Sequence, residues 1–439
     1  VDPWLLGLLI LSVALRAPYM FNIAVLKGAQ DFKSTAIVAL AGAGFNLTVL
    51  AWEDPGTVAE NQLRLACSGP VGIKNLLLDN RFDEVFEQDP SSMTVLDSII
   101  AEYQSDPAFL GYYLGDEPFP ERFARLGEWF RLLRARDPLH PAWNNLLGRS
   151  VFATRGEWLD YLRDYAAATQ PAVLCTDHYD HTLQGDRGQF IENVAGTAQV
   201  AREYGLPFWG VVLVIQHFQY RVVDDALLRW QVAQWLSYGC TGVGYFTYWT
   251  PDSSADRASG WTEGMIRWGT GERSSHYEQV RSLNQRVRPL GEALAGLVWL
   301  STEHAGGTPA GGTPFAPDSL VAAVEGRIAL GTFADADGAP WLFVANRDSS
   351  ASQSVALELV GERRAERMGK DCRRGDAHCI ERNRTDLAPT EQRRAPAMSV
   401  PRQPTMECRH DRKPRHSRPQ GSREHRPDRA RDRGGDTLL

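Results

Sequence analysis

Short apolar segments alternate with amphipathic segments from about residue 18 to residue 297. The apolar segments are rich in β-branched and aromatic residues, and their continuous hydrophobicity is typical of strands buried on both faces of a parallel sheet. Eight strands are predicted in this part of the chain. They span residues 20–25, 46–51, 73–79, 110–115, 142–147, 172–177, 208–215 and 243–249.

Between these strands, apolar residues recur at the spacing of one helix face. Phe123, Leu126, Phe130 and Leu133 form one such face, and two further faces lie before and after the last predicted strand. Strands that alternate with helices predict an α/β fold with a parallel sheet, and eight such units match a (β/α)₈ TIM barrel in number and size. The alternative is a doubly wound open sheet, but no G-x-G-x-x-G motif follows the first predicted strand.

After residue 297 the pattern changes to shorter strands separated by turns. The predicted strands cover residues 320–324, 328–333, 341–345 and 355–359, with a hairpin turn at Asp337-Gly338. They predict a small antiparallel, β-sandwich-like domain over residues 298–390, which is incomplete unless residues 361–390 add strands. Residues 391–439 show no periodicity and predict a disordered basic tail or a segment translated outside the native reading frame.

Charge divides the chain into an acidic body, residues 1–360, and a basic C-terminal part, residues 361–439. Residues 361–439 contain 21 Lys and Arg against 13 Asp and Glu and no Phe, Trp or Tyr, whereas residues 1–360 contain 26 Lys and Arg against 41 Asp and Glu. An acidic body without a basic stripe argues against nucleic acid as the main partner. Its acids and aromatic rings favour a carbohydrate partner instead. The sequence indicates no particular oligomeric state.

The first 17 residues predict an apolar leader or a partial signal segment. The apolar run covers residues 4–15, which is shorter than the roughly 20 residues that span a bilayer, so no membrane span is expected. No basic residue precedes the run, although a signal peptide begins with a positively charged region. Secretion, a periplasmic location and a cytoplasmic location therefore all stay open. The cysteines include no C-x-x-C pair, and His178, His181 and His217 lack metal-binding spacing on a helix, so no metal site and no cofactor are expected.

Candidate chemistry gathers directly after the predicted strands, where the active sites of such barrels lie. The strongest pattern is Gly-Tyr-Tyr-Leu-Gly-Asp-Glu-Pro over residues 111–118, which places two adjacent acids, Asp116 and Glu117, at the end of the fourth strand. Repulsion and partial burial raise the pKa of at least one acid of such a pair, which gives a proton donor near neutral pH. Asp116 has an alternative role as the N-cap of the following helix, which would leave Glu117 unexplained.

Several motifs in the same chain order resemble those of the barrel glycoside hydrolases of the β-galactosidase-like and cellulase-like superfamily. They are residues 111–118, Asn145-Leu-Leu, Asp177-His-Tyr, Pro207-Phe-Trp and residues 236–251. The resemblance implies a glycosidase that acts on O-glycosyl bonds. It also implies that Glu117, at the end of strand four, is the general acid and then the base, with Asp116 in place of the usual Asn. An aromatic residue after strand eight commonly forms the floor of the sugar subsite in this superfamily, which corresponds to Trp249.

The chain departs from the superfamily at strand seven, where the nucleophile is a Glu and this chain has Gln216 followed by His217. Three alternatives are open. The first is a different second carboxylate, for which the candidates are Asp177, Asp180, Asp252 and Glu263. The second is substrate assistance, in which the 2-acetamido group of the sugar attacks and Asp116 orients it, because the adjacent Asp-Glu pair is similar to that of hexosaminidases of this type. The third is a non-catalytic carbohydrate-binding barrel.

Other polar and aromatic residues near the strand ends are candidates for sugar binding, because sugar hydroxyls need polar partners and sugar faces stack on rings. The predicted substrate-binding residues are Trp52, Asn145, Asp177, Tyr179, Gln216, Tyr248 and Trp249. Glu53 and Asp79 are further subsite candidates.

Overall fold

The computed structural model describes only part of the chain. It covers residues 21–26, 41–50, 57–82, 93–251, 260–361, 364–368 and 378–384. Within these, the side chains of residues 21–26, 50, 364–368 and 378–384 are not described. The predicted leader (1–17), the candidates Trp52, Glu53 and Asp252, and the predicted tail (391–439) lie outside the described residues.

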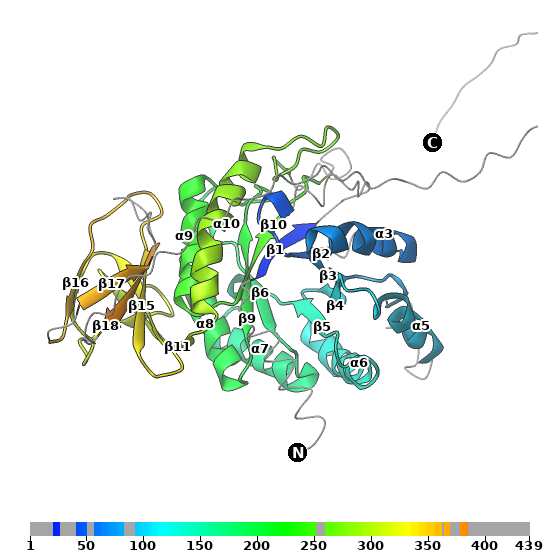
Figure 1. Cartoon of the computed structure of the whole chain (residues 1–439), viewed down its shortest axis with the longest axis horizontal. Coiled ribbons are helices and arrows are strands. Elements are labelled where there is room, and N and C mark those ends of the chain that lie inside the picture. Colours follow the sequence, from blue (N-terminus) through cyan, green and yellow to red (C-terminus); the bar gives the residue numbers. More distant parts are fainter. Residues whose placement is uncertain are drawn as a thin grey trace, which may run out of the picture. The chain divides into compact units, whose positions relative to one another are not determined.

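Eight parallel strands form the first sheet, in the order β5-β4-β3-β2-β1-β10-β9-β6 (Figure 1). These strands are β1 (Phe21–Leu26), β2 (Leu47–Leu50), β3 (Lys74–Leu77), β4 (Phe109–Asp116), β5 (Ala142–Asn145), β6 (Leu174–Asp177), β9 (Phe208–Leu213) and β10 (Gly242–Phe246). A parallel bridge between Leu146 and Thr176 joins β5 to β6, and Leu146 N donates to Cys175 O at 3.0 Å. The bridge closes the sheet into a barrel, so the predicted barrel of eight parallel strands is confirmed, and each of the eight predicted strands overlaps one of its strands.

Helices connect the strands and surround them (Figure 1). The described helices are α3 (Val58–Ser68), α5 (Met93–Tyr103), α6 (Phe123–Arg136), α7 (Arg155–Thr169), α8 (Phe190–Glu203), α9 (Asp225–Ser237) and α10 (Ser275–Leu294), with the 3₁₀ helices η1 (Gly69–Val71), η2 (Pro120–Arg122) and η3 (Arg149–Val151). Local sequence determines where several begin. Thr154, for example, forms a capping box with Glu157 at the start of α7. The predicted apolar face of α6, from Phe123 to Leu133, is buried.

Two further sheets follow the barrel. One has six strands in the order β12-β11-β14-β15-β18-β17, and the other pairs β13 with β16. The strands are β11 (Val298–Ala305), β12 (Thr313–Pro314), β13 (Val321–Glu325), β14 (Ile328–Ala334), β15 (Pro340–Asn346), β16 (Ala356–Leu359), β17 (Arg364–Met368) and β18 (His378–Arg384). Neighbouring strands are antiparallel except β11 and β12. Side chains of both sheets, including Val321, Ile328, Leu330 and Leu342, share one apolar core.

The four strands predicted after residue 297 correspond to β13, β14, β15 and β16, and β17 and β18 lie within residues 361–390, the segment expected to complete the domain. Strand β11 is not predicted, because Ser301, Glu303 and His304 interrupt its apolar pattern. A two-stranded hairpin, β7 (His181–Thr182) and β8 (Gly185–Asp186), lies between β6 and α8. The domain boundaries at residues 17, 297 and 390 stay predictions.

Polar contacts join these β-strands to the end of α9. Thr302 Oγ1 donates to Ser237 O at 2.7 Å, and Tyr238 Oη and His304 Nε2 share a hydrogen bond at 2.8 Å. Burial lowers the pKa of His304 to about 3, so its ring is neutral. Gly331 passes so close to Ser237 O that a Cβ at this position would overlap it. Helix α9 is thus covered by β9 on one side and by β14 and β15 on another, which explains why residues all around it are buried.

Candidate active site

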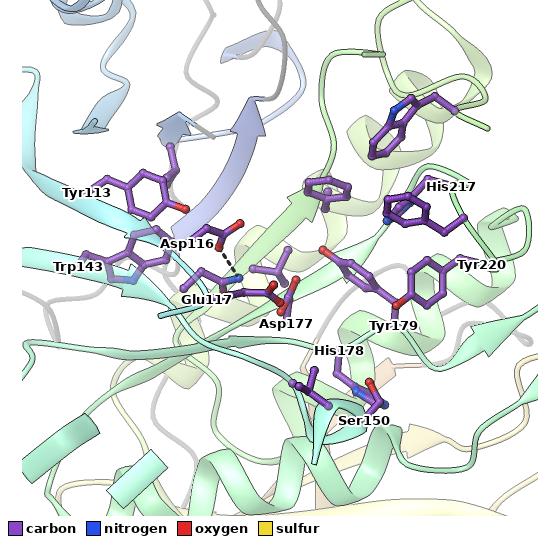
Figure 2. Close-up of a pocket in the computed structure, with 18 residues that line it drawn as sticks. Tyr113, Asp116, Glu117, Trp143, Ser150, Asp177, His178, Tyr179, His217 and Tyr220 are labelled. Carbon is purple, nitrogen blue, oxygen red and sulfur yellow. Dashed lines mark hydrogen bonds between the residues drawn. The ribbon is translucent and has the colours of Figure 1, made fainter. Parts of the chain in front are cut away.

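A cavity of about 280 Å³ lies at the carboxyl ends of the barrel strands (Figure 2). Asp116, Asn145, Asp177 and Phe246, the last residues of β4, β5, β6 and β10, all line it. The complete lining is Val49, Tyr113, Asp116, Glu117, Trp143, Asn145, Gly148, Ser150, Val151, Asp177, His178, Tyr179, Val211, His217, Phe218, Tyr220, Phe246 and Trp261. Its position is that of the active site in barrels of this kind.

The backbone after β4 turns sharply to present Glu117. Gly115 has φ 107° and Glu117 has φ 43°, a left-handed conformation that is unfavourable for residues other than glycine. Glu117 N donates to Asn145 O at 2.9 Å, which ties the turn to β5. The N-cap residue of the next helix, η2, is Phe119, and it makes no side-chain capping hydrogen bond. Asp116 therefore does not cap that helix.

Three carboxyl groups, those of Asp116, Glu117 and Asp177, point into the same space (Figure 2). Glu117 and Asp177 are half-buried and share a hydrogen bond. Asp177 also accepts hydrogen bonds from Tyr179 and Asn145. Asp116 is the most exposed of the three, and its Oδ1 accepts a hydrogen bond from Asn145 Nδ2 at 3.2 Å. Asn145 thus connects the two aspartates, which come from neighbouring parts of the barrel.

The close approach of these acids favours protonation. The negative charge of Asp177 raises the pKa of Glu117, and burial and the charge of Asp116 raise it further. Burial raises the pKa of Asp177, with a smaller contribution from Asp116. Because Glu117 and Asp177 are hydrogen-bonded, they titrate as a pair that retains a proton above the ordinary carboxyl range. The site therefore offers a proton donor near neutral pH.

Aromatic rings form the wall opposite the carboxyl groups (Figure 2). The rings of His217 and Trp261 are stacked, with centroids 4.6 Å apart and an interplanar angle of 18°. Those of Tyr179 and Phe246 are stacked at 5.8 Å and 30°. Tyr220 packs edge-on against Tyr179 at 5.4 Å. Such a wall presents both apolar ring faces and hydroxyl groups, which suits a sugar ring.

The cavity brings together five of the residues singled out in the sequence, namely Asp116, Glu117, Asn145, Asp177 and Tyr179. Three of the predicted substrate-binding residues lie outside its lining. Tyr248 is 1% exposed and packs edge-on against Phe45 in the core. Trp249 is half-buried, and its backbone pairs with Ile266. Gln216, also half-buried, accepts a hydrogen bond at its backbone oxygen from Thr262 N.

Several lining residues are absent from the predicted set. Trp261 and Tyr220 belong to segments that follow β10 and β9, and nothing in their local sequence marks them as part of a site. Tyr113 and Trp143 could have been found from the sequence. They lie three residues before Asp116 and two residues before Asn145, which the sequence places at strand ends.

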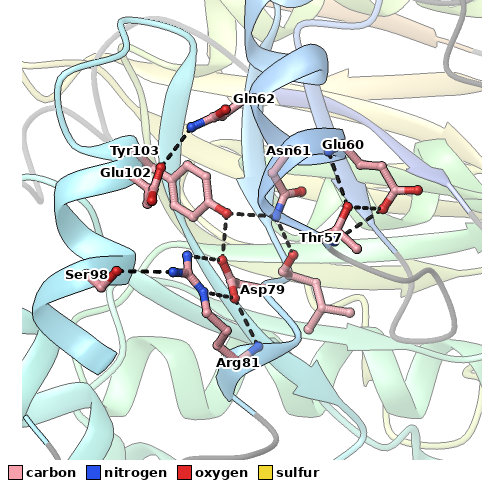
Figure 3. A network of polar contacts seen from close by, with 10 residues as sticks. Thr57, Glu60, Asn61, Gln62, Asp79, Arg81, Ser98, Glu102 and Tyr103 are labelled. Atoms are coloured by element: carbon pink, nitrogen blue, oxygen red, sulfur yellow. Dashed lines mark hydrogen bonds and ion pairs between the residues drawn. The ribbon is translucent and has the colours of Figure 1, made fainter. Parts of the chain in front are cut away.

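Asp79, which follows β3 and is a subsite candidate in the sequence, belongs to a structural network (Figure 3). Its Oδ2 accepts hydrogen bonds from Tyr103 Oη at 2.6 Å and from Arg81 Nη2 at 2.7 Å. Asn61 Nδ2 donates both to Leu78 O at 2.8 Å and to Tyr103 Oη at 3.2 Å. The network joins α3, β3 and α5, and Asp79 does not line the cavity.

We expect Asp79→Ala to lower the free energy of unfolding by about 3 kcal/mol, because the Asp79 side chain is 1% exposed and its loss leaves Arg81 and Tyr103 without this partner. Asp97→Ala removes the exposed ion pair with Arg136 and is the matched control, with an expected cost below about 1 kcal/mol. Urea denaturation of both variants measures the difference. Equal costs would mean that the Asp79 network adds no stability beyond that of a surface ion pair.

Among the described residues, no cluster of His, Cys, Asp or Glu is arranged to hold a metal ion. No helix in that part of the chain is long and apolar enough to cross a membrane. Cys67, Cys175 and Cys240 are buried.

No protein-family model and no curated protein matches the chain. Solved structures do match it. A β-galactosidase from the psychrophilic Marinomonas ef1 matches at 10% identity and a TM-score of 0.49, over 63% of this chain but only 62% of its own length. A family 5 mannosidase from Rhizomucor miehei matches at 9% identity and a TM-score of 0.46, over 63% of this chain and 94% of its own length.

A family 10 xylanase from Thermobacillus composti matches at 14% identity and a TM-score of 0.43, over 62% of this chain and 99% of its own length. At these identities the likeness is one of fold alone.

Proposed function

We propose that this protein hydrolyses O-glycosidic bonds, with Glu117 as general acid and then base and with water as the final acceptor. The observation that carries the proposal is the hydrogen-bonded pair of Glu117 and Asp177 at the strand ends, facing a wall of aromatic rings across the cavity. A glycosidic oxygen is a poor leaving group unless it is protonated as the bond breaks. Glu117, held protonated by its neighbours, supplies this proton.

The spacing of the pair favours substrate assistance over a mechanism with two separate carboxylates. Retaining enzymes place their carboxyl groups about 5–5.5 Å apart and inverting enzymes about 6.5–9.5 Å apart, so that a sugar carbon or a water fits between them. Glu117 and Asp177 are in direct hydrogen-bond contact, which leaves no such space. Of the other candidate second carboxylates, Asp180 and Glu263 do not line the cavity, and Asp252 lies outside the described residues. We therefore place the attacking group on the substrate itself.

In this route, the carbonyl oxygen of a 2-acetamido group attacks the anomeric carbon while the bond to the leaving oxygen breaks and Glu117 transfers its proton to that oxygen. A bicyclic oxazolinium ion results. Water then attacks the anomeric carbon, Glu117 takes a proton from this water, and the acetamido group is restored. Asp116 orients the acetamido N–H, and its own carboxylate is held by Asn145 and Tyr113.

Charge in the cavity favours uncharged sugars. The described lining contains three acidic side chains and neither Lys nor Arg. A sugar carboxylate about 4 Å from one of these acids would be repelled by roughly 4 kcal/mol at an effective dielectric constant of 20. Glycosides of uronic acids are therefore expected to be poor substrates.

A panel of aryl glycosides in both anomeric forms tests this proposal. We expect the N-acetylhexosaminides to be hydrolysed at least about tenfold faster than the matched hexosides, and the glycosiduronides to be slowest. A tenfold rate difference corresponds to about 1.4 kcal/mol of activation free energy. A higher rate on hexosides would instead favour a second carboxylate. Binding of oligosaccharides without release of any aryl group would support the alternative, a non-catalytic carbohydrate-binding barrel, which the absence of a Glu at position 216 favours.

A further inference from the structure

We propose that Tyr161, assisted by Tyr165, is a positioning residue that holds the turn carrying Glu117. The two tyrosines lie four residues apart on α7 and are both buried, so their side chains lie on the same face of the helix. Neither lines the cavity. The proposal rests on the proposed function, because it assigns these residues a role that acts through Glu117.

Tyr161 joins the turn after β4 to the segment after β5 through one hydroxyl group. Its Oη donates to Pro118 O at 2.9 Å and accepts a hydrogen bond from Leu147 N at 3.2 Å. Pro118 directly follows Glu117 and has no N–H, so its carbonyl oxygen is the one backbone group through which this residue can be held. The ring packs against Phe123 and Phe152, with centroids 5.2 Å and 4.9 Å away, which fixes the direction of the hydroxyl group.

Tyr165 supports the other end of the same turn through Asn144. Tyr165 Oη donates to Asn144 Oδ1 at 3.2 Å, and Asn144 Nδ2 donates to Gly115 O at 2.8 Å. The carbonyl groups of Gly115 and Pro118, on either side of Asp116 and Glu117, are therefore both held by contacts that lead back to α7.

The turn needs this support because Glu117 has a left-handed backbone conformation, which persists only where the surroundings impose it. Without the Tyr161 hydroxyl group, Pro118 O and Leu147 N lose a shared partner and the turn can relax. The Glu117 carboxyl group would then move relative to Asp177, and a displacement of about 1 Å is enough to lower a rate by about a hundredfold.

The test is Tyr161→Phe, which removes the hydroxyl group and keeps the ring. We expect kcat to fall about ten- to a hundredfold with KM little changed, and the alkaline limb of the rate profile to move to lower pH as Glu117 leaves Asp177. In a Glu117→Gln background the same substitution should have no further effect on kcat, because residues that act through one group are not additive.

Tyr245→Phe is the matched control. Tyr245 is fully buried in β10, and its Oη donates to Asn284 Oδ1 at 2.7 Å, so this variant also loses a buried hydroxyl group, with one hydrogen bond against the two of Tyr161. We expect a similar loss of thermal stability and an unchanged kcat and pH profile. An unchanged kcat and pH profile in Tyr161→Phe, or equal kinetic losses in both variants, would overturn the positioning role.

A readout independent of turnover separates this proposal from the proposed function. Carbon-13 NMR of labelled glutamate carboxyl groups, with the Glu117 signal assigned from Glu117→Gln, follows the titration of Glu117. Tyr161→Phe should move this titration to lower pH, and Tyr245→Phe should not. If the parent protein hydrolyses no glycoside, the proposed function fails, and the titration alone decides whether Tyr161 positions Glu117.

Discussion

Replacing Glu117 with Gln is expected to lower kcat/KM by about 10²- to 10⁴-fold on every glycoside that the parent protein hydrolyses, which is the usual contribution of a general acid. Gln has nearly the same shape and can still donate a hydrogen bond, but it has no proton to transfer to a leaving oxygen. The loss should be smallest for aryl groups that leave readily as anions. Initial rates on a series of aryl glycosides with leaving groups of different pKa measure this dependence.

Glu121→Gln is the control for this experiment. Glu121 lies four residues further along in η2 and is exposed, so the same chemical change should leave the rate unaltered. A parent-like rate for Glu117→Gln on all substrates would remove Glu117 from the mechanism and leave the pair with Asp177 without a catalytic role.

Asp177→Asn is expected to lower the rate at neutral pH by about ten- to a hundredfold and to move the pH optimum toward acid. The sign follows from the cause of the shift. The charge of Asp177 is the largest contribution that raises the pKa of Glu117, so a neutral Asn lowers that pKa and a smaller fraction of Glu117 carries a proton at pH 7. Rate profiles from pH 4 to pH 9 measure the displacement of the alkaline limb. A limb that stays in place would show that Asp177 does not control the protonation of Glu117.

Asp177→Asn is expected to lower activity but to reduce the loss of stability that accompanies rising pH. Because the pKa values of Glu117 and Asp177 are raised on folding, the folded protein binds more protons than the unfolded chain above the ordinary carboxyl range. Stability therefore falls as the pH rises through this interval, and Asp177→Asn should weaken that fall. Urea denaturation at pH 5 and pH 8 measures the slope.

Asp180 provides the opposite case for comparison. Burial alone would raise its pKa, but hydrogen bonds from His178 and from the backbone N–H groups of Gln189 and Gly188 lower it overall. Asp180→Asn should therefore cost stability at neutral pH, since the ionised form stabilises the fold above the ordinary carboxyl pKa. The two variants should differ in sign although the residues lie three positions apart.

The barrel could be predicted because its signals are local. Each buried strand is a short apolar run, and eight such runs that alternate with helices match a closed barrel in number and size. The strand-end rule then selects Asp116, Glu117, Asn145 and Asp177 together, since parallel strands end at the same edge of the barrel. Their hydrogen bonds to one another follow from the order of the strands and from the turn after β4.

The aromatic part of the site depends on long-range packing and could not be predicted in this way. Trp261 reaches the cavity by stacking on His217, which belongs to a different segment of the chain. Tyr248 and Trp249 lie in the same predicted strand as Phe246, residues 243–249, yet the strand ends at Phe246 and of these three only Phe246 lines the cavity. Nothing in the sequence distinguishes Phe246 from Tyr248 and Trp249 as a cavity residue. Tyr161 is similarly hidden, because a helical period reveals the buried face and not the target of a hydroxyl group.

The junction of β5 and β6 has a consequence for the motion of the barrel. Other neighbouring strands share ladders of paired residues, whereas β5 and β6 are joined by the bridge between Leu146 and Thr176. A side-chain hydrogen bond from Asn145 to Asp177 also crosses this junction. A ligand that contacts both residues would link β5 and β6 where only this bridge pairs their backbones. Such a ligand is expected to stabilise the closed barrel, because a ligand that binds only the folded state raises its stability.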